Sequence, residues 1–174
     1  IKKINIKKIK TLPGVIKKSV LRDISQLKKK KYFKGLKFSN LPILMGVLNL
    51  TPNSFSDGGK YTYQNSGEKH AKKLVNDGCG ILDIGGEATN PGSSEVGLDK
   101  EWKRIFPTLS KIKKLKIFIS LDTRKSEIME KGIKNKVNLI NDVSGLEHDL
   151  STVKILKKTN VPFVIHHMQG NPKT

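Results

Sequence analysis

The sequence predicts an α/β fold assembled from repeated strand–helix units. Apolar segments with the length of buried strands occur at residues 43–50, 79–85, 117–121, 137–143 and 163–167, with helical apolar stripes between them. Each segment stops at a loop rich in Asn, Asp, Thr, Gly or His. Polar groups at the carboxyl ends of successive parallel strands are typical of a βα barrel. A doubly wound sheet has the same spacing and stays open as the alternative.

The first unit starts with a strand and a long polar loop. Residues 43–50 are almost entirely apolar, which predicts a strand buried on both faces. The loop at residues 51–59, TPNSFSDGG, is polar and glycine-rich, which suits a movable cover over a site. A helix is expected over residues 66–76, before the second strand at 79–85.

The later units repeat this alternation. Residues 99–115 place apolar side chains on one helical face, with acids in the first turn and an expected kink at Pro107. The next helices are expected at 124–134 and 149–159. Strict alternation of strands and helices implies right-handed βαβ units and a parallel sheet.

Residues 1–40 form a separate basic region, which we interpret as an N-terminal extension or linker preceding the domain at 41–174. The chain has a net charge of +19, and fourteen of its 34 Lys and Arg lie in residues 1–38. Only three are Arg, the preferred residue for phosphate and base contacts, so the composition argues against nucleic-acid binding. Helical apolar spacing over residues 15–27 predicts one amphipathic helix within this linker. Binding of that helix to a membrane surface or to a partner helix is the less favoured alternative.

The single cysteine, Cys79, excludes an internal disulfide and fits a reducing, cytoplasmic location. Its position between Gly78 and Gly80, at a strand start, predicts a buried structural thiol. No apolar run reaches the roughly 20 residues of a membrane-spanning helix, so no membrane partner is expected.

The strand ends supply the candidate site residues. Asn49 offers a carbonyl oxygen to a hard cation, although its loop also fits a solvated turn. Asp83 and Glu87 suggest either acid–base work or support of a loop. Asp122 either fixes a ligand N–H or caps the following helix. Asn141 offers both donors and acceptors.

Two histidines, His166 and His167, lie at the end of the fifth expected strand. Adjacent strand residues point to opposite faces, which argues against a shared metal ion. The sequence has no Walker loop, GxGxxG, HExxH or nucleophile elbow. The expected rim suits a flat heterocycle with many N–H and C=O groups plus a cation-bound anion, and it combines Asn49, Thr89, Asp122, Asn141 and Met168.

Five motifs carry a family resemblance. They are MGVLNLTPNSFSDGG at residues 45–59, DIGGEATNPGS at 83–93, and SLDT, INDVSG and HHMQGNPKT at the next three strand ends. Together they resemble the dihydropteroate synthase family of pterin-binding enzymes over residues 41–174. The resemblance implies a TIM (βα)8 barrel, truncated here after about the fifth strand.

The resemblance also implies a transferase reaction of folate biosynthesis. The family condenses 6-hydroxymethyl-7,8-dihydropterin pyrophosphate with p-aminobenzoate, giving dihydropteroate and pyrophosphate. Early loss of pyrophosphate leaves a pterin cation that the arylamine attacks. The implied roles are Mg²⁺ binding for Asn49, pyrophosphate contact for Thr89, pterin binding for Asp122, Asn141 and Met168, and p-aminobenzoate contact for Phe55 and Pro91. A homodimer is implied if the full barrel is present.

Two departures from the family pattern bear on activity. Asn90 stands where the family usually has Arg, which removes a bidentate phosphate donor. The family's later pterin carboxylate, its Gly-Phe-Gly-Lys lysine and its basic Arg/His group are missing, so we expect a fragment with little turnover alone. The alternatives are a pterin-binding methyltransferase domain, which the Thr-Asn of the second motif resembles, and a non-catalytic product of a decayed gene.

Overall fold

A computed structural model of the chain describes residues 9–28, 42–51, 63–88 and 93–166. The chain divides into two compact units, Ile1–Tyr32 and Phe33–Thr174. The boundary predicted at residue 40 lies outside the described ranges and stays a prediction.

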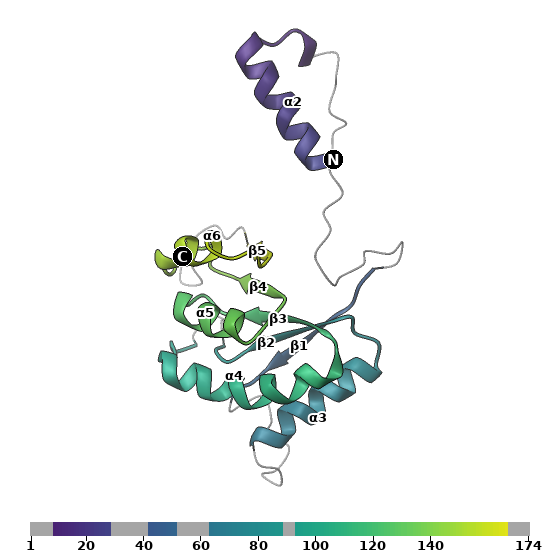
Figure 1. The fold of residues 1–174 in the computed structure, drawn as a ribbon, viewed down its shortest axis with the longest axis vertical. Coiled ribbons are helices and arrows are strands. Elements are labelled where there is room, and N and C mark those ends of the chain that lie inside the picture. The colour runs from purple at the N-terminus through teal and green to yellow at the C-terminus, as the bar shows by residue number, and fades with distance from the viewer. Residues whose placement is uncertain (1–8, 29–41, 52–62, 89–92, 167–174) are drawn as a thin grey trace. The chain divides into compact units, whose positions relative to one another are not determined.

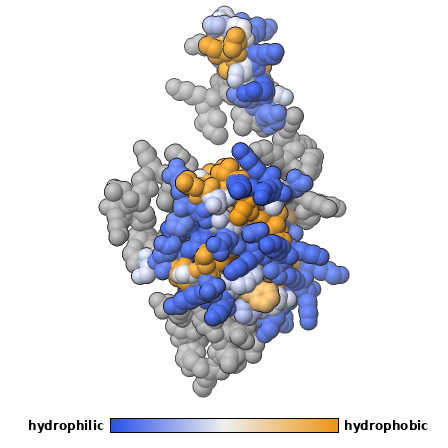
Figure 2. Space-filling model, turned by 60° about the vertical axis from the view of Figure 1, so that its left-hand side comes forward, coloured by the Kyte–Doolittle hydropathy of each residue, from blue (hydrophilic) through white to orange (hydrophobic). Residues whose placement is uncertain are grey.

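The first unit contains helix α2, Gly14–Lys28, which confirms the predicted amphipathic helix. Several of its apolar side chains are exposed, including Val15 at 86% and Ile16 at 51%. Figure 2 shows hydrophobic side chains on the surface of this segment. No helix in the described part of the chain is long and apolar enough to cross a membrane.

The second unit is a five-stranded sheet with helices on one face (Figure 1). All strands are parallel and follow the order β1-β2-β3-β4-β5. The strands are β1 (Met45–Asn49), β2 (Ile81–Gly85), β3 (Phe118–Asp122), β4 (Leu139–Asp142) and β5 (Phe163–Ile165). Because this order never reverses, the described sheet has no topological switch point, which rules out the doubly wound alternative. The architecture is that of successive βα-barrel units.

The helices between the strands confirm the predicted alternation. They are α3 (Tyr63–Asn76), α4 (Leu98–Ile112), the short 3-10 helix η2 (Lys113–Leu115), α5 (Ser126–Lys134) and α6 (Ser151–Lys157). Pro107 lies inside α4 without ending it, and its carbonyl oxygen accepts a hydrogen bond from Ser110 Oγ at 2.9 Å. The strand and helix boundaries differ from the predicted ones by a few residues.

The core lies between the sheet and its covering helices. Leu48, Ile84, Leu121 and Ile140 come from four successive strands and are fully buried there, against Ile105 and other side chains of the helices. Cys79 packs against this core while partly exposed, and burial raises the pKa of its thiol. The opposite face of the sheet carries a smaller cluster around Phe118.

The first strand is not buried on both faces, contrary to the prediction. In β1 buried and exposed residues alternate, with Leu48 at 0% and Val47 at 54% exposure. All three residues of β5 are exposed, whereas all five residues of β2 are buried. The physical reason is position, because β1 and β5 are the edge strands of the described sheet. An apolar run shows that a segment is a strand, but not how many faces are covered.

Candidate functional site

Three predicted site residues lie in one row across the sheet. Parallel pairing aligns Asn49 with Gly85, Gly85 with Asp122, and Asp122 with Asn141. The first three of these residues are the last of their strands, so the row lies at the carboxyl edge. The structure therefore brings together Asn49, Asp122 and Asn141, which are 92 positions apart at most in the chain. Four other predicted residues lie outside the described ranges: Phe55, Thr89, Pro91 and Met168.

Gly85 keeps the centre of this row open. A Cβ built on Gly85 would lie 3.3 Å from Oδ2 of Asp122, which is tighter than most such contacts. A side chain at this position would push against the carboxyl group. The glycine therefore keeps the sheet surface between Asn49 and Asp122 free of any β2 side chain.

Asp122 has a raised pKa and a buried oxygen without a hydrogen-bond partner in the described structure. Burial, and then the nearby charge of Asp83, raises the pKa of Asp122 to about 7. Its Oδ1 atom is buried and has no hydrogen-bond partner among the described residues. The alternative that Asp122 caps the next helix is wrong. Lys125 occupies the cap position of α5, and the amide N–H of Ser126 donates to Asp149 Oδ2 at 2.9 Å.

Asn141 is held from two sides. Its Nδ2 donates to Asp83 Oδ2 at 3.0 Å, and its Oδ1 lies 3.1 Å from Nε2 of His166. The second oxygen of Asp83 and the hydroxyl of Ser120 are buried, and neither has a partner within the described structure. Polar groups with unused hydrogen-bonding capacity thus gather on one face of the sheet. Buried polar atoms in this state usually meet water or a ligand.

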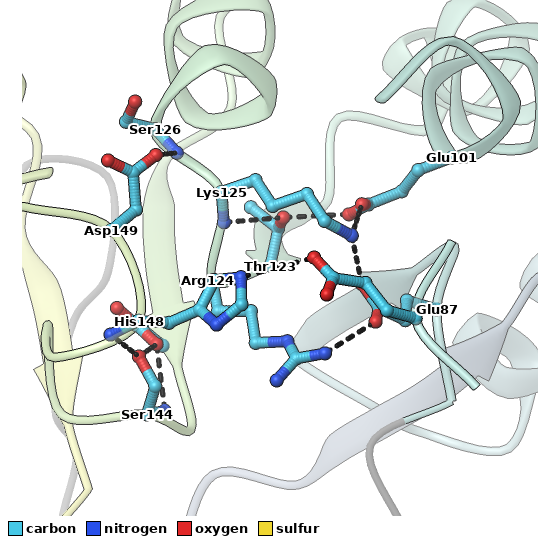
Figure 3. A network of polar contacts seen from close by, with 11 residues as sticks. Glu87, Glu101, Thr123, Arg124, Lys125, Ser126, Ser144, His148 and Asp149 are labelled. Atoms are coloured by element: carbon cyan, nitrogen blue, oxygen red, sulfur yellow. Dashed lines mark hydrogen bonds and ion pairs between the residues drawn. The ribbon is translucent and has the colours of Figure 1, made fainter. Parts of the chain in front are cut away.

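A buried ion cluster lies beside the row and is drawn in Figure 3. Lys125 Nζ contacts Oε2 of Glu87 and lies 2.7 Å from Oε2 of Glu101. Thr123 Oγ1 donates to the other oxygen of Glu101 at 2.7 Å, and Arg124 donates to Oε1 of Glu87 at 2.7 Å. These five residues make up the ion cluster. The Lys125, Glu87 and Glu101 side chains are 8%, 4% and 0% exposed.

The charges in the ion cluster stabilise one another. Burial alone would raise the pKa of Glu87, but hydrogen bonds from Lys125 and Arg124 outweigh it and leave that pKa lowered. Burial would likewise lower the pKa of Lys125, yet its bonds to Glu101 and Glu87 leave it raised. The carboxylate of Glu87 is therefore charged and fully engaged in ion pairs that fix the loop after β2. The structure favours loop support over the acid–base role considered for Glu87.

The ion cluster joins the loop after β2 to α4 and to the loop after β3. Arg104, on α4, adds a hydrogen bond to the carbonyl oxygen of Gly86 at 2.8 Å. A Cβ on Gly86 would come within 2.9 Å of the backbone oxygen of Glu101, so α4 packs directly on this turn. The segment that enters the loop at Glu87 is thus fixed in position. The sequence did not predict this cluster. The one signal for it was Glu101, an acidic residue on α4, the helix that also carries the apolar stripe.

The loop after β4 is organised by Asp142. Its fully buried carboxylate accepts hydrogen bonds from the N–H and Oγ of Ser144, and from the N–H of Leu146. Gly145 has a φ of +67°, in the left-handed region that favours glycine. These contacts fix the backbone just beyond Asn141.

The described residues contain no group of three or more His, Cys, Asp or Glu side chains that could hold a metal ion. Asn49, by contrast, is exposed at the carboxyl edge and carries a neutral amide oxygen.

Comparison with known sequences gives a consistent match. Residues 45–174 match the family model described as "Pterin binding enzyme". The dihydropteroate synthase of Bacillus subtilis is 41% identical over 134 residues, and that of Escherichia coli is 40% identical. Each alignment covers 76% of this chain and 47% of the relative. The chain thus spans about half the length of the curated relatives it matches.

Comparison with solved structures agrees. A Clostridium difficile dihydropteroate synthase determined in the presence of pteroic acid has a TM-score of 0.72 and 38% identity, over 78% of this chain and 52% of that one. The Xanthomonas albilineans enzyme with 4-aminobenzoic acid has a TM-score of 0.71 and 35% identity, over 75% and 48%. Sequence motifs, strand order and these matches lead to one conclusion: the chain belongs to the pterin-binding enzyme family.

Proposed function

We propose that this chain supplies the pterin-binding part of a dihydropteroate synthase. The reaction joins 6-hydroxymethyl-7,8-dihydropterin pyrophosphate to p-aminobenzoate and yields dihydropteroate and pyrophosphate. The observation that carries the proposal is the row in which Asn49, Gly85, Asp122 and Asn141 align at the carboxyl edge. The named relatives and the pteroic acid and 4-aminobenzoic acid structures support it.

The row can bind the pterin ring through hydrogen bonds. A pterin presents N–H groups next to ring nitrogens and a carbonyl along one edge. Asp122 has an unpartnered oxygen that can accept such an N–H, and Asn141 retains one N–H and one lone pair. Such contacts fix the orientation of the ring and present its side-chain methylene for attack.

The same groups favour the reaction electrostatically. The bond between the methylene carbon and the pyrophosphate oxygen breaks, and its electron pair leaves with pyrophosphate. The pterin then carries positive charge until the amine nitrogen of p-aminobenzoate bonds to the methylene and loses a proton. The carboxyl groups of Asp83 and Asp122, close enough to interact, stabilise that charge in a partly buried site.

Asn49 is proposed to bind Mg²⁺ together with the pyrophosphate. A bound Mg²⁺ would offset negative charge on the leaving group. The exposed amide oxygen of Asn49 fits this role because Mg²⁺ keeps several waters and binds through few protein oxygens plus substrate phosphates. Thr89 is proposed to contact pyrophosphate, Phe55 and Pro91 to contact p-aminobenzoate, and Met168 to line the pterin pocket. The complete enzyme is proposed to be a homodimer.

Ligand binding to the purified chain tests the proposal. Binding of 6-hydroxymethylpterin is measured by calorimetry, and Asp122→Ala is expected to weaken it at least about tenfold, the worth of a charged hydrogen bond. Asp99→Ala is the matched control, because Asp99 is an exposed carboxylate in the first turn of α4. Absence of pterin binding by the wild-type chain, or equal effects of the two variants, would contradict the proposal.

A further inference from the structure

His166 lies on this face of the sheet and has no role in the reaction proposed above. It follows β5, whose residue Val164 pairs with Asn141 across the sheet. Residues two apart in a strand point to the same face, so His166 continues the face that Val164 and Asn141 share. Its ring reaches back across the sheet, placing Nε2 3.1 Å from Oδ1 of Asn141.

The backbone of His166 is held in place by the loop after β4. A Cβ on Gly145 would lie 2.7 Å from the carbonyl oxygen of His166, so only glycine permits this approach. Gly145 itself is fixed by its positive φ and by an N–H bond to the carbonyl oxygen of Asp142 at 3.3 Å. The loop that follows Asn141 therefore packs on the residue that contacts the Asn141 side chain.

Two contacts together hold the orientation of the Asn141 amide. Its Nδ2 donates to the Asp83 carboxylate, and its Oδ1 faces Nε2 of His166. An amide oxygen only accepts hydrogen bonds, which means that Nε2 of His166 must carry a proton. Both the Nε2–H neutral form and the imidazolium meet this requirement. Turning the amide over would set an oxygen against the Asp83 carboxylate and an N–H against Nε2–H.

We propose that His166 is a positioning residue that sets the specificity of the pterin site through Asn141. With one lone pair of Oδ1 and one N–H of Nδ2 already used, Asn141 offers a ligand one donor beside one acceptor. That pattern selects heterocycles that present an acceptor next to a donor, and it rejects rings with two like groups at that edge. This inference rests on the proposed function and adds a residue to it.

The contact itself is tested by nuclear magnetic resonance on the chain labelled with ¹⁵N-histidine. Long-range ¹H–¹⁵N correlations distinguish the two neutral tautomers, and the signal lost in His166→Ala identifies His166. The expected result is a proton on Nε2 of His166 in the wild-type chain. A neutral ring protonated on Nδ1 instead would overturn the inference, whatever the ligand data show.

Binding of 6-hydroxymethylpterin and of p-aminobenzoate is then compared across variants. His166→Ala is expected to weaken pterin binding about tenfold, the worth of one hydrogen bond, while p-aminobenzoate binding stays unchanged. His166→Gln, which can still donate to Asn141, is expected to recover most of the loss. His70→Gln, on the exposed surface of α3, is the matched control.

The outcomes separate the two proposals. If the wild-type chain binds no pterin, the proposed function fails, and the tautomer measurement still decides whether His166 holds Asn141. If the wild-type chain binds pterin and His166→Ala binds it equally well, the proposed function stands and the role of His166 is refuted. Equal weakening for pterin and p-aminobenzoate would show general loss of structure, which also overturns the specificity role.

Discussion

Lys125 and Glu101 form an ion pair at 2.7 Å between side chains that are 8% and 0% exposed. One residue belongs to the loop after β3 and the other to the first turn of α4. Buried pairs of this kind contribute less to net stability than their short distance suggests, because both charges lose water. Removing one partner is far more costly, since the other charge stays buried alone.

Lys125→Met is therefore expected to destabilise the second unit by about 3–5 kcal/mol. The variant leaves two buried carboxylates, Glu87 and Glu101, without their shared cation. Urea unfolding followed by circular dichroism measures the change in free energy of unfolding. Lys134→Met is the control, because its pair with Glu130 is exposed, and a loss below about 1 kcal/mol is expected there. Equal losses in the two variants would show that the ion cluster has no special role.

The raised pKa of Asp122 makes the free energy of unfolding decrease as the pH rises. Its folded pKa of about 7 exceeds the ordinary value of 3.8, so the folded state holds this proton more tightly than the unfolded state. Its contribution to stability is therefore full below the ordinary value and declines as pH rises towards about 7. Asp122→Asn is expected to remove that decline, leaving the variant more stable than wild type at about pH 8. Melting temperatures at about pH 5 and pH 8 measure it, and parallel curves for the two proteins would refute the assignment.

Glu87 makes the stability depend on pH with the opposite sign, and over a lower pH range. Its folded pKa lies below the ordinary value of 4.5, so its contribution to stability is present above that value and is lost as pH falls through the folded pKa. Glu87→Gln is expected to reduce the acid sensitivity of unfolding below about pH 4.5 while lowering stability at neutral pH. Acid titration followed by circular dichroism makes the measurement. Unchanged acid sensitivity in the variant would count against the pairing with Lys125.

Gly86→Ala tests the contact between α4 and the turn after β2. The new Cβ would lie 2.9 Å from both the Glu101 backbone oxygen and Ile105 Cγ1, and overpacking of this kind costs about 1–3 kcal/mol. Gly97→Ser is the control, because nothing lies within 4 Å of a Cβ there. Gly97 is the N-cap of α4, where serine is favourable, so that variant is expected to be neutral or slightly stabilising. Thermal unfolding of both variants decides, and a fully stable Gly86→Ala protein would contradict the packing described.

Asp142→Ala is expected to loosen the loop after β4. The change leaves three donors, on Ser144 and Leu146, without their acceptor, which costs about 1–3 kcal/mol. Amide hydrogen exchange should rise at Ser144 and Leu146. Glu147→Ala, an exposed change in the same loop, is expected to leave exchange there unaltered. Comparable exchange in the two variants would argue that Asp142 does not organise the loop.

The strands and the site row were predictable because each depends on local pattern plus one rule of topology. Apolar runs ending in polar residues mark strands, and parallel strands bring their carboxyl ends to one edge. Asn49, Asp122 and Asn141 were placed together on that basis, and the register confirms their alignment. The roles that the family resemblance assigns to these residues remain proposals.

The ion cluster and the exposure of the edge strands could not be predicted in the same way. Glu101 looks like an ordinary first-turn acid, favourable at a helix N-terminus, and nothing local shows that it is buried. Its partner Lys125 is 24 residues away, and only the packing of α4 against the sheet brings the two together. The His166–Asn141 contact likewise depends on strand register, which a one-residue shift would abolish.

The strand order also has a consequence for how the protein is made. Since the sheet order is the chain order, each strand pairs with the one synthesised immediately before it. A nascent chain can therefore extend the sheet at one edge as each strand–helix unit leaves the ribosome, without waiting for a distant segment. Folding in this direction leaves β5 at the growing edge of the described sheet, where its exposed apolar residues form a surface that a chaperone can bind.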